Sequence, residues 1–197
     1  MKILKIKKRV SKKEIEEIIR YLKEGKVIVF PTDTVYGLLA NATNREAIER
    51  IFKIKKRSSQ NFLPIFVKDI KMAKEIAKIK RWQEEFLKKV WPGKVTVVLE
   101  RRRKKLKIYG VSSKNIALRV PNHRLLLKIL EKINFPLSAT SANLSGFPPS
   151  TKIRDILNQF KNEKEKPDLI IDSGNLSRAK PSVILDLTTF PIKILRL

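Results

Sequence analysis

The chain has 197 residues, of which 45 are Lys or Arg and 19 are Asp or Glu, giving a formal net charge of +26 at pH 7. It has no cysteine, which excludes disulfides, thiolate catalysis and cysteine-based metal sites, and its one histidine, His123, cannot form a zinc site unaided. The charge favours polyanions as partners, although a solvated Lys- and Glu-rich surface, as in proteins from hot environments, accounts for part of it. The length favours a single domain over residues 1–197.

Membrane and export signals are missing from the sequence. No apolar run approaches the roughly 18 residues that cross a bilayer, and the N-terminus lacks a signal-peptide core. We therefore expect a cytoplasmic protein.

The chain begins with a predicted strand over residues 2–6. A helix follows, because Ser11 and Glu14 form a capping box in front of an apolar stripe with helical spacing. Gly25 is expected to end that helix. The continuous apolar run over residues 27–30 predicts a buried strand.

The middle of the chain continues the alternation of helices and strands. Asn44 is predicted to cap a helix, a strand is predicted over residues 63–67, and Asp69 is predicted to cap the next helix. A short amphipathic helix over residues 82–90 leads through a turn to a strand over residues 95–99.

The last part follows the same pattern. A strand over residues 116–120 precedes a helix capped by Asn122, and a strand over residues 136–139 precedes a helix capped by Ser150. The remaining predicted strands cover residues 169–172, 183–187 and 192–195. Strands interleaved with helices predict an α/β fold, and the closeness of the last two strands predicts a mixed sheet.

Two polar loops follow predicted strands, at residues 31–38 and 138–146. The first offers hydroxyl groups and one carboxylate, and the second offers hydroxyl groups and an amide. Each also contains a glycine, which is typical of loops that approach a nucleotide. Ordinary turns with bonds between side chains and backbone would look similar. Within the first loop, Asp33 could serve as a general base or could brace its own loop.

Cations are concentrated at two further places. Lys55 and Arg57 end a helix, where they either complement the helix dipole or bind phosphates. The run over residues 101–107 is a candidate for RNA phosphate contacts or a solvated hairpin, and without aromatic residues it does not favour base stacking. His123, near a predicted helix cap, is interpreted as structural. The sequence has no Walker A loop, dinucleotide-binding glycine motif or nucleophile elbow.

Seven motifs occur in a fixed order along the chain. They are Pro-Thr-Asp-Thr-Val-Tyr-Gly-Leu at 31–38, Lys-x-Arg at 55–57, Trp-Pro-Gly at 91–93 with its Thr-Val-Val-Leu strand, Ala-Leu-Arg-Val-Pro-Asn-His at 117–123, Ser-Ala-Thr-Ser-Ala-Asn-Leu-Ser-Gly at 138–146, Asp-Leu-Ile-Ile-Asp-Ser-Gly at 168–174 and Pro-Ser-Val-Ile-Leu-Asp-Leu at 181–187. In this order the chain, from about residue 11 to its end, resembles the YrdC/Sua5 family of threonylcarbamoyl-AMP synthases.

The resemblance implies a YrdC-like fold, a twisted mixed β-sheet surrounded by helices with a concave basic cleft. It implies that L-threonine, bicarbonate and ATP give threonylcarbamoyl-AMP and pyrophosphate, with Mg²⁺ arriving on ATP. A separate threonylcarbamoyl transferase complex would then modify adenosine 37 in tRNAs reading codons that begin with A, and tRNA itself is a candidate partner.

The resemblance also assigns roles by position. Lys55 and Arg57 would act in catalysis and bind ATP, and the residues that contact threonine would be Thr34, Arg119 and Ser182. Further ATP contacts would come from Asn61, Asn115, Ser141, Asn143, Thr151 and Arg196. No residue is assigned to a protein-held metal.

Three departures from the family pattern stand out. Ser58 and Phe62 replace prolines that follow the Lys-x-Arg motif, and Phe66 stands where many members have a histidine near threonine. The chain resembles the short form of the family, which has no C-terminal Sua5 domain.

Two other functions fit the sequence less well. One is a non-catalytic RNA-binding module of the same fold, which the charge and the arginine run favour. The other is a carbamoyl-handling domain of the hydrogenase-maturation type, which normally sits in a much longer chain with zinc-binding and acylphosphatase parts.

Overall fold

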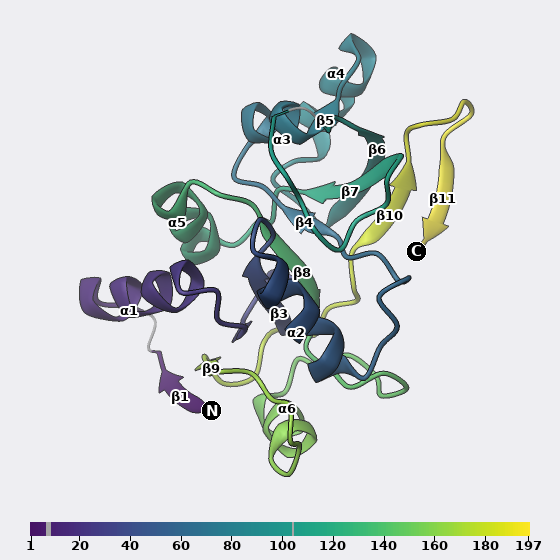
Figure 1. The fold of residues 1–197 in the computed structure, drawn as a ribbon. Helices are drawn as coiled ribbons and strands as arrows, with labels where there is room; N and C mark the ends of the chain where they lie inside the picture. Colours follow the sequence, from purple (N-terminus) through teal and green to yellow (C-terminus); the bar gives the residue numbers. More distant parts are fainter. Residues whose placement is uncertain (7–8, 104) are drawn as a thin grey trace.

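The computed structural model describes residues 1–6, 9–103 and 105–197. These described residues form an eleven-stranded mixed sheet with the order β1-β9-β2-β3-β8-β4-β7-β6-β10-β11, while β5 pairs with β6 outside this order (Figure 1). The strands are β1 (Lys2–Lys5), β2 (Ile28–Phe30), β3 (Gly37–Asn41), β4 (Ile65–Phe66), β5 (Ala77–Lys78), β6 (Val95–Arg101), β7 (Asn115–Arg119), β8 (Leu137–Ser141), β9 (Leu169–Asp172), β10 (Val183–Asp186) and β11 (Lys193–Arg196). The predicted α/β fold with a mixed sheet is confirmed.

The six predicted helices are all present in the described part of the chain. They are α1 (Lys12–Lys23), α2 (Arg45–Lys55), α3 (Ile70–Ile76), α4 (Arg81–Val90), α5 (Arg124–Ile133) and α6 (Ile153–Phe160). The caps of the first three were predicted correctly, since Ser11, Asn44 and Asp69 each accept a backbone N–H with their side chains. Such a cap contributes about 1 kcal/mol to the stability of its helix.

Two predicted caps were wrong. His123, not Asn122, caps α5, because its Nδ1 accepts the N–H of Leu126 at 3.3 Å. Helix α6 begins at Ile153 after Lys152 rather than at Ser150. The Ser150 hydroxyl instead accepts the Lys152 N–H and lies 2.7 Å from the Asp155 carboxylate, so it stabilises the turn that precedes the helix.

Strands β3 and β5 were missed by the sequence analysis. Strand β3 runs antiparallel between β2 and β8, and its apolar stretch is only three residues long, directly after a polar turn. The second polar loop was also partly misassigned, because Ser138 to Ser141 belong to β8 and pair with β3. This pairing sets Gly37 opposite Ser141, so the two polar segments predicted to form one site are direct neighbours.

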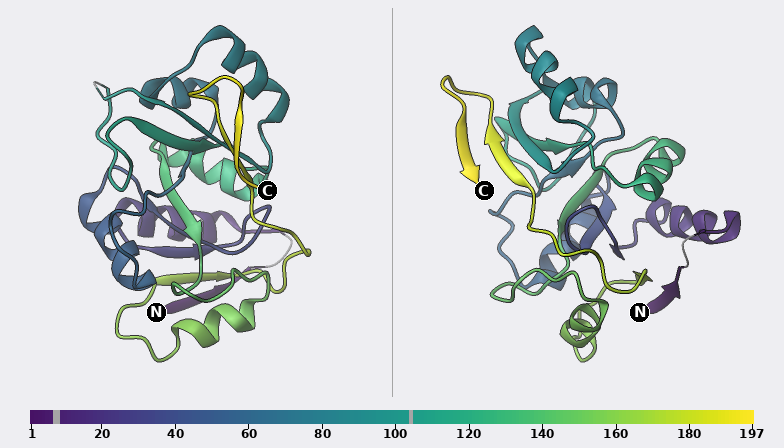
Figure 2. Two further views of the ribbon diagram at one scale, coloured as in Figure 1. Left: turned by 90° about the vertical axis from the view of Figure 1, so that its right-hand side faces the viewer. Right: turned by 180° about the vertical axis from the view of Figure 1, so that it is seen from behind.

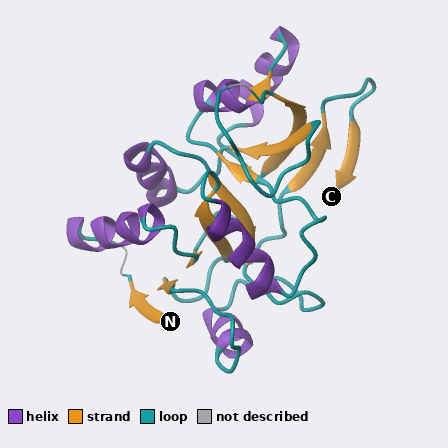
Figure 3. Ribbon diagram, in the orientation of Figure 1, coloured by secondary structure: helices purple, strands orange, loops and turns teal. Residues whose placement is uncertain are grey.

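Helices cover both faces of the central strands, as Figures 1 and 3 show. Val29 and Leu38 pack in one apolar cluster with side chains of α2 and α6. Ile28, Phe30 and Leu39 pack in a second cluster with side chains of α1 and α5. Because both faces are buried, these strands are continuously apolar rather than alternating.

The sheet ends in the hairpin of β10 and β11, which extends away from the rest of the molecule (Figure 2). Strand β11 is exposed along its length, and Ile194, Leu195 and Leu197 are large exposed apolar residues. Strand β10 pairs in parallel with β6, so the hairpin is attached to the sheet next to the start of β6.

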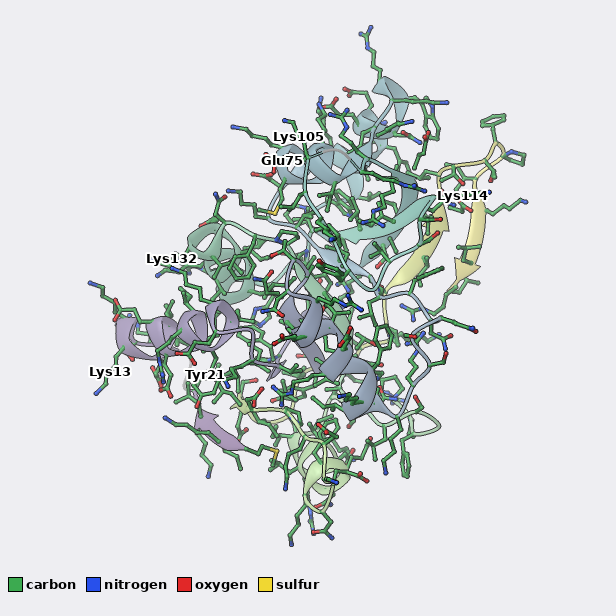
Figure 4. All side chains as sticks on the ribbon, viewed as in Figure 1. Lys13, Tyr21, Glu75, Lys105, Lys114 and Lys132 are labelled. Carbon is green, nitrogen blue, oxygen red and sulfur yellow. The ribbon has the colours of Figure 1, made fainter. Side chains whose placement is uncertain are left out.

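Charged side chains project outwards from the helices. Figure 4 shows Lys13 on α1 and Lys132 on α5 pointing away from the molecule. Within the described ranges, no helix combines the length and apolar character needed to span a bilayer.

Candidate substrate pocket

A cavity of about 230 Å³ opens at one end of the central strands. It lies where the turn before β3, the ends of β4, β7 and β8, and the start of the β10–β11 hairpin meet. The lining residues are Thr32, Thr34, Val35, Gly37, Arg57, Phe62, Pro64, Phe66, Thr96, Arg119, Ala139, Thr140, Ser141, Pro149, Pro181, Ser182, Ile184 and Arg196. Three guanidinium groups and no carboxylate line it, so the cavity suits an anionic ligand.

Six of the predicted site residues line this cavity. They are Thr34, Arg57, Arg119, Ser141, Ser182 and Arg196. The others lie elsewhere. Asn61 is exposed in a turn closed by its bonds to Ser58, Thr151 is outside the lining, and Asn115 lines a separate hollow.

Lys55 and Asn143 are absent from the cavity lining and are joined to each other by hydrogen bonds. The Lys55 amine donates to the carbonyls of Ser141 and Asn143, both at 2.7 Å, and to Asn143 Oδ1 at 3.2 Å. The Asn143 amide donates in turn to the carbonyls of Leu144 and Phe147. Both side chains are buried, so they stabilise the loop after β8 and place Ser141 in the cavity wall.

Burial, together with a smaller effect of the nearby positive charge of Arg57, lowers the pKa of Lys55 to about 8. The three acceptors around the amine favour the charged form and so oppose this lowering of the pKa. Only the ammonium has three N–H donors, one for each acceptor. We therefore assign Lys55 as the ammonium at neutral pH.

The first polar loop is a turn held by its own threonines. The Thr32 hydroxyl donates to the Val35 carbonyl at 2.7 Å and accepts the Thr34 N–H at 3.0 Å, and the two threonine hydroxyls lie 3.0 Å apart. Tyr36, which also lies in the loop over residues 31–38, does not line the cavity. It is fully buried and donates to the Gly174 carbonyl at 2.7 Å.

Arg119 is the most deeply buried cation of the cavity, with 2% of the residue exposed. Its Nε donates to the Gly93 carbonyl at 2.8 Å, and its Nη2 forms an ion pair with Asp33 Oδ1 at 2.7 Å. Burial lowers the pKa of Arg119 and the Asp33 carboxylate opposes that shift. An arginine retains its proton in such a setting, so the cavity holds a buried positive charge.

The opposite wall comes from the start of the hairpin. The Ser182 hydroxyl lies 2.8 Å from the Thr96 hydroxyl, and Arg196 donates to the Ser182 carbonyl from Nε and Nη2. Sequence reasoning missed Thr96 as a site residue. A polar residue inside the apolar run of β6 was the available signal.

Arg57 reaches the cavity because α2 ends sharply. Lys56 has a left-handed backbone conformation (φ 51°), and the N–H groups of residues 56 and 57 bond back to the last turn. The Arg57 side chain is half-buried, and within the described residues it makes no hydrogen bond or ion pair. It is therefore available to a ligand.

The donor set does not suit a metal held by protein. The described chain contains no group of three or more His, Asp or Glu residues placed to bind an ion. Asp33, whose carboxylate pairs with the lining residue Arg119, also accepts the Asn122 N–H.

Comparison with known proteins identifies relatives of the whole chain. A family model for Sua5, YciO and YrdC, described as "Telomere recombination", matches residues 20–197. The threonylcarbamoyl-AMP synthase of Pyrococcus abyssi is 34% identical over 98% of this chain and 56% of its own length. A putative threonylcarbamoyl-AMP synthase of Methanocaldococcus jannaschii is 31% identical over 95% of this chain and 86% of its own length.

Solved structures agree with this assignment. The structure of P. abyssi Sua5 complexed with L-threonine superimposes with a TM-score of 0.90 and 34% identity, covering all of this chain and 57% of that one. E. coli YciO, at 24% identity, shares the fold with a TM-score of 0.87. The chain spans about half the length of its P. abyssi and Bacillus subtilis relatives. On the family match and these relatives, the chain belongs to the Sua5/YciO/YrdC family.

Proposed function

We propose that this chain is an L-threonylcarbamoyladenylate synthase, a nucleotidyltransferase that converts L-threonine, bicarbonate and ATP to threonylcarbamoyl-AMP and pyrophosphate. The observation that carries the proposal is the convergence of six predicted site residues on one cavity with three arginines and no carboxylate. Relatives bearing the name of this activity add support.

In this proposal, different residues of the cavity would bind threonine and ATP. Arg119, with the hydroxyls of Thr34 and Ser182 nearby, would bind the carboxylate and polar groups of threonine, since a guanidinium and a carboxylate match in charge and shape. Arg57 and Arg196 would bind phosphates at the more open side. A volume of about 230 Å³ is below that of typical ligand pockets, so most of the nucleotide would extend outwards past Ser141 and Pro149.

The reaction has an electrostatic obstacle that this arrangement would reduce. The threonine amine and bicarbonate form a carbamate with loss of water, and a carbamate oxygen attacks the α-phosphorus of ATP while the bond to pyrophosphate breaks. Both reactants are anionic, so they repel each other in water. Fixed guanidinium groups would offset that repulsion and stabilise the charge that develops during transfer. Mg²⁺ would arrive bound to the phosphates of ATP.

Pyrophosphate release tests the proposal. We expect release by the purified chain only when ATP, threonine and bicarbonate are all present. Arg57→Ala should lower the rate about 100-fold without unfolding the chain, because the side chain contributes charge rather than packing. Arg45→Ala, an exposed arginine at the start of the same helix, is the matched control and should retain activity. Release that continues without threonine would contradict the proposal.

A second function is favoured by a separate hollow of about 820 Å³ at the far end of β6 and β7. Six cations and one carboxylate line it: Lys78, Arg101, Arg102, Arg103, Lys105, Lys114 and Glu100. Lys104, in the same basic run, lies outside the described residues. An RNA-binding module would use this surface, and tRNA binding that weakens steeply with salt, with no pyrophosphate release, would favour that function.

The product would pass to a transferase that acts on tRNA, outside this chain. Threonylcarbamoyl-AMP carries an activated acyl group, which a nucleophile of the tRNA would accept while AMP leaves. The transferase complex and the cytoplasmic setting are part of the same proposal.

A further inference from the structure

Three residues contact the Arg119 guanidinium, and the family resemblance assigns none of them a role in substrate binding. The Asp33 carboxylate forms an ion pair with its Nη2, the Gly93 carbonyl accepts a hydrogen bond from its Nε, and the centre of the Phe66 ring lies 5.6 Å from its Cζ. We propose that Asp33, Gly93 and Phe66 are positioning residues that fix the Arg119 guanidinium in the orientation that receives an amino-acid carboxylate. The proposal rests on the function proposed above.

Gly93 supplies the first fixed point. Its N–H donates to the Val120 carbonyl and its own carbonyl accepts from Arg119, so the turn is attached to the end of β7. A Cβ at this position would lie 2.3 Å from the Val90 carbonyl oxygen, a distance that real Cβ atoms do not show. Only glycine lets the chain pass this close, which accounts for the glycine of the Trp-Pro-Gly motif.

Asp33 supplies the second point and is itself held. Its Oδ2 accepts the Asn122 N–H at 3.0 Å, and its Oδ1 lies 2.7 Å from Arg119 Nη2. Both partners in this ion pair are almost fully buried. The carboxylate is absent from the cavity lining, and both of its oxygens face protein groups, so it acts on Arg119.

Phe66 supplies the third contact. Its ring is buried in the cavity wall and packs near the guanidinium as a cation–π partner. A phenyl ring offers no hydrogen-bonding group, so it competes for none of the guanidinium donors. Nη2 faces the Asp33 carboxylate and Nε bonds to Gly93, whereas Nη1 of Arg119 makes no hydrogen bond to any described residue, although the residue is nearly buried. The clamp thus presents Nη1 to the cavity.

Two physical effects of Asp33 predict opposite outcomes for its removal. If the Asp33 carboxylate only offsets part of the positive charge of Arg119, then Asp33→Asn should tighten threonine binding. If it orients the guanidinium, the same change should weaken binding, because the freed side chain populates rotamers that miss the ligand. The structure, with the carboxylate fixed by Asn122, favours orientation.

The kinetic test separates these effects. We expect Asp33→Asn and Phe66→Leu each to raise the KM for threonine about 10-fold while the KM for ATP changes less than about 2-fold. In an Arg119→Lys background neither change should add a further loss, since a lysine has no guanidinium to orient. A threonine KM that falls or stays constant, or losses that simply multiply in the double variants, would overturn the proposal.

A matched control exists elsewhere in the chain. Asp168 accepts the Val27 N–H at 2.8 Å and pairs with Arg50 at 2.6 Å, which repeats the arrangement of Asp33 away from the cavity. Asp168→Asn should lower stability but leave the threonine KM unchanged. An equal rise in KM in this control would show that Asp33 acts only through general stability, and would overturn the positioning role.

A second readout does not depend on activity. In isotope-labelled protein without ligand, the Nε–H group of Arg119, assigned with Arg119→Lys, should exchange slowly with water. Asp33→Asn and Phe66→Leu should each accelerate this exchange, and Asp168→Asn should not. If pyrophosphate release fails but the slow exchange is present, the proposed function is wrong and the clamp stands. Fast exchange in the unchanged chain would refute the clamp.

Discussion

At the scale of single residues, Lys55 and Arg57 show how two cations of one short motif can face different surroundings. Lys55 is surrounded by three protein acceptors, whereas Arg57, two residues on, lines the cavity and has no partner among the described residues. The family resemblance assigns both to catalysis. The contacts favour a bracing role for Lys55, and that catalytic assignment remains a prediction.

The bracing role can be measured. Lys55→Met keeps the length of the side chain but leaves the carbonyls of Ser141 and Asn143 without their partner in a buried site. Unpaired buried acceptors are costly, so we expect the free energy of unfolding to fall by about 2–4 kcal/mol.

Lys53→Met provides the control, because Lys53 is exposed on the same helix. Its effect should stay within about 0.5 kcal/mol. Equal stability of the two variants in denaturant titrations would show that the Lys55 amine contributes no net stabilisation.

At the scale of elements, helix α5 depends on a titrating cap. Burial lowers the pKa of His123, the nearby Asp33 carboxylate acts in the opposite direction, and Nδ1 must be unprotonated to accept the Leu126 N–H. His123 therefore takes up a proton more readily in the unfolded chain than in the folded chain. The stability that its cap contributes is fully present above the pKa of His123 in the unfolded chain, and it is lost as the pH falls through the pKa in the folded chain.

His123→Asn keeps a side-chain cap and removes this titration. Between about pH 7 and pH 5 we expect the unchanged chain to lose more unfolding free energy than the variant, because only the histidine must give up its cap on protonation. Chemical denaturation at several pH values measures the difference. Parallel pH curves for the two proteins would contradict the assignment.

Local signals account for what the sequence revealed about the elements. Caps such as Ser11 and Asn44 act within three residues of chain, and apolar periodicity marks a buried helix face, so all six helices were predicted. Strand β3 was missed because its three apolar residues become a strand only through pairing with β2 and β8. His123 was not expected as a cap because imidazole rarely takes that role.

The candidate site was predicted in part, through the resemblance of its motifs to a known family. Thr34, Arg119 and Ser141 lie in motifs that the resemblance assigns, and all three line the cavity. The contact of Asp33 with Arg119 and the pairing of Thr96 with Ser182 join segments 86 residues apart in the chain, and no local pattern specifies them. Only the folded sheet brings these segments together.

At the scale of the whole molecule, the cavity depends on elements from every part of the chain. The turn before β3, the end of α2, the end of β7 and the hairpin of β10 and β11 each contribute at least one cationic or hydroxyl group. The exposed hairpin contributes Arg196, although its strand lies at the edge of the sheet. The net charge of +26 adds a long-range attraction for anionic substrates that salt would weaken.

The most direct test of this account is a crystal structure of the chain with L-threonine and a non-hydrolysable ATP analogue. We predict that the threonine carboxylate contacts Arg119 Nη1, that its amine points towards the nucleotide, and that Arg57 and Arg196 contact the phosphates. Either ligand bound outside the cavity lined by Thr34, Arg119 and Ser182 would contradict the claim that one cationic pocket brings the amino acid and the triphosphate together.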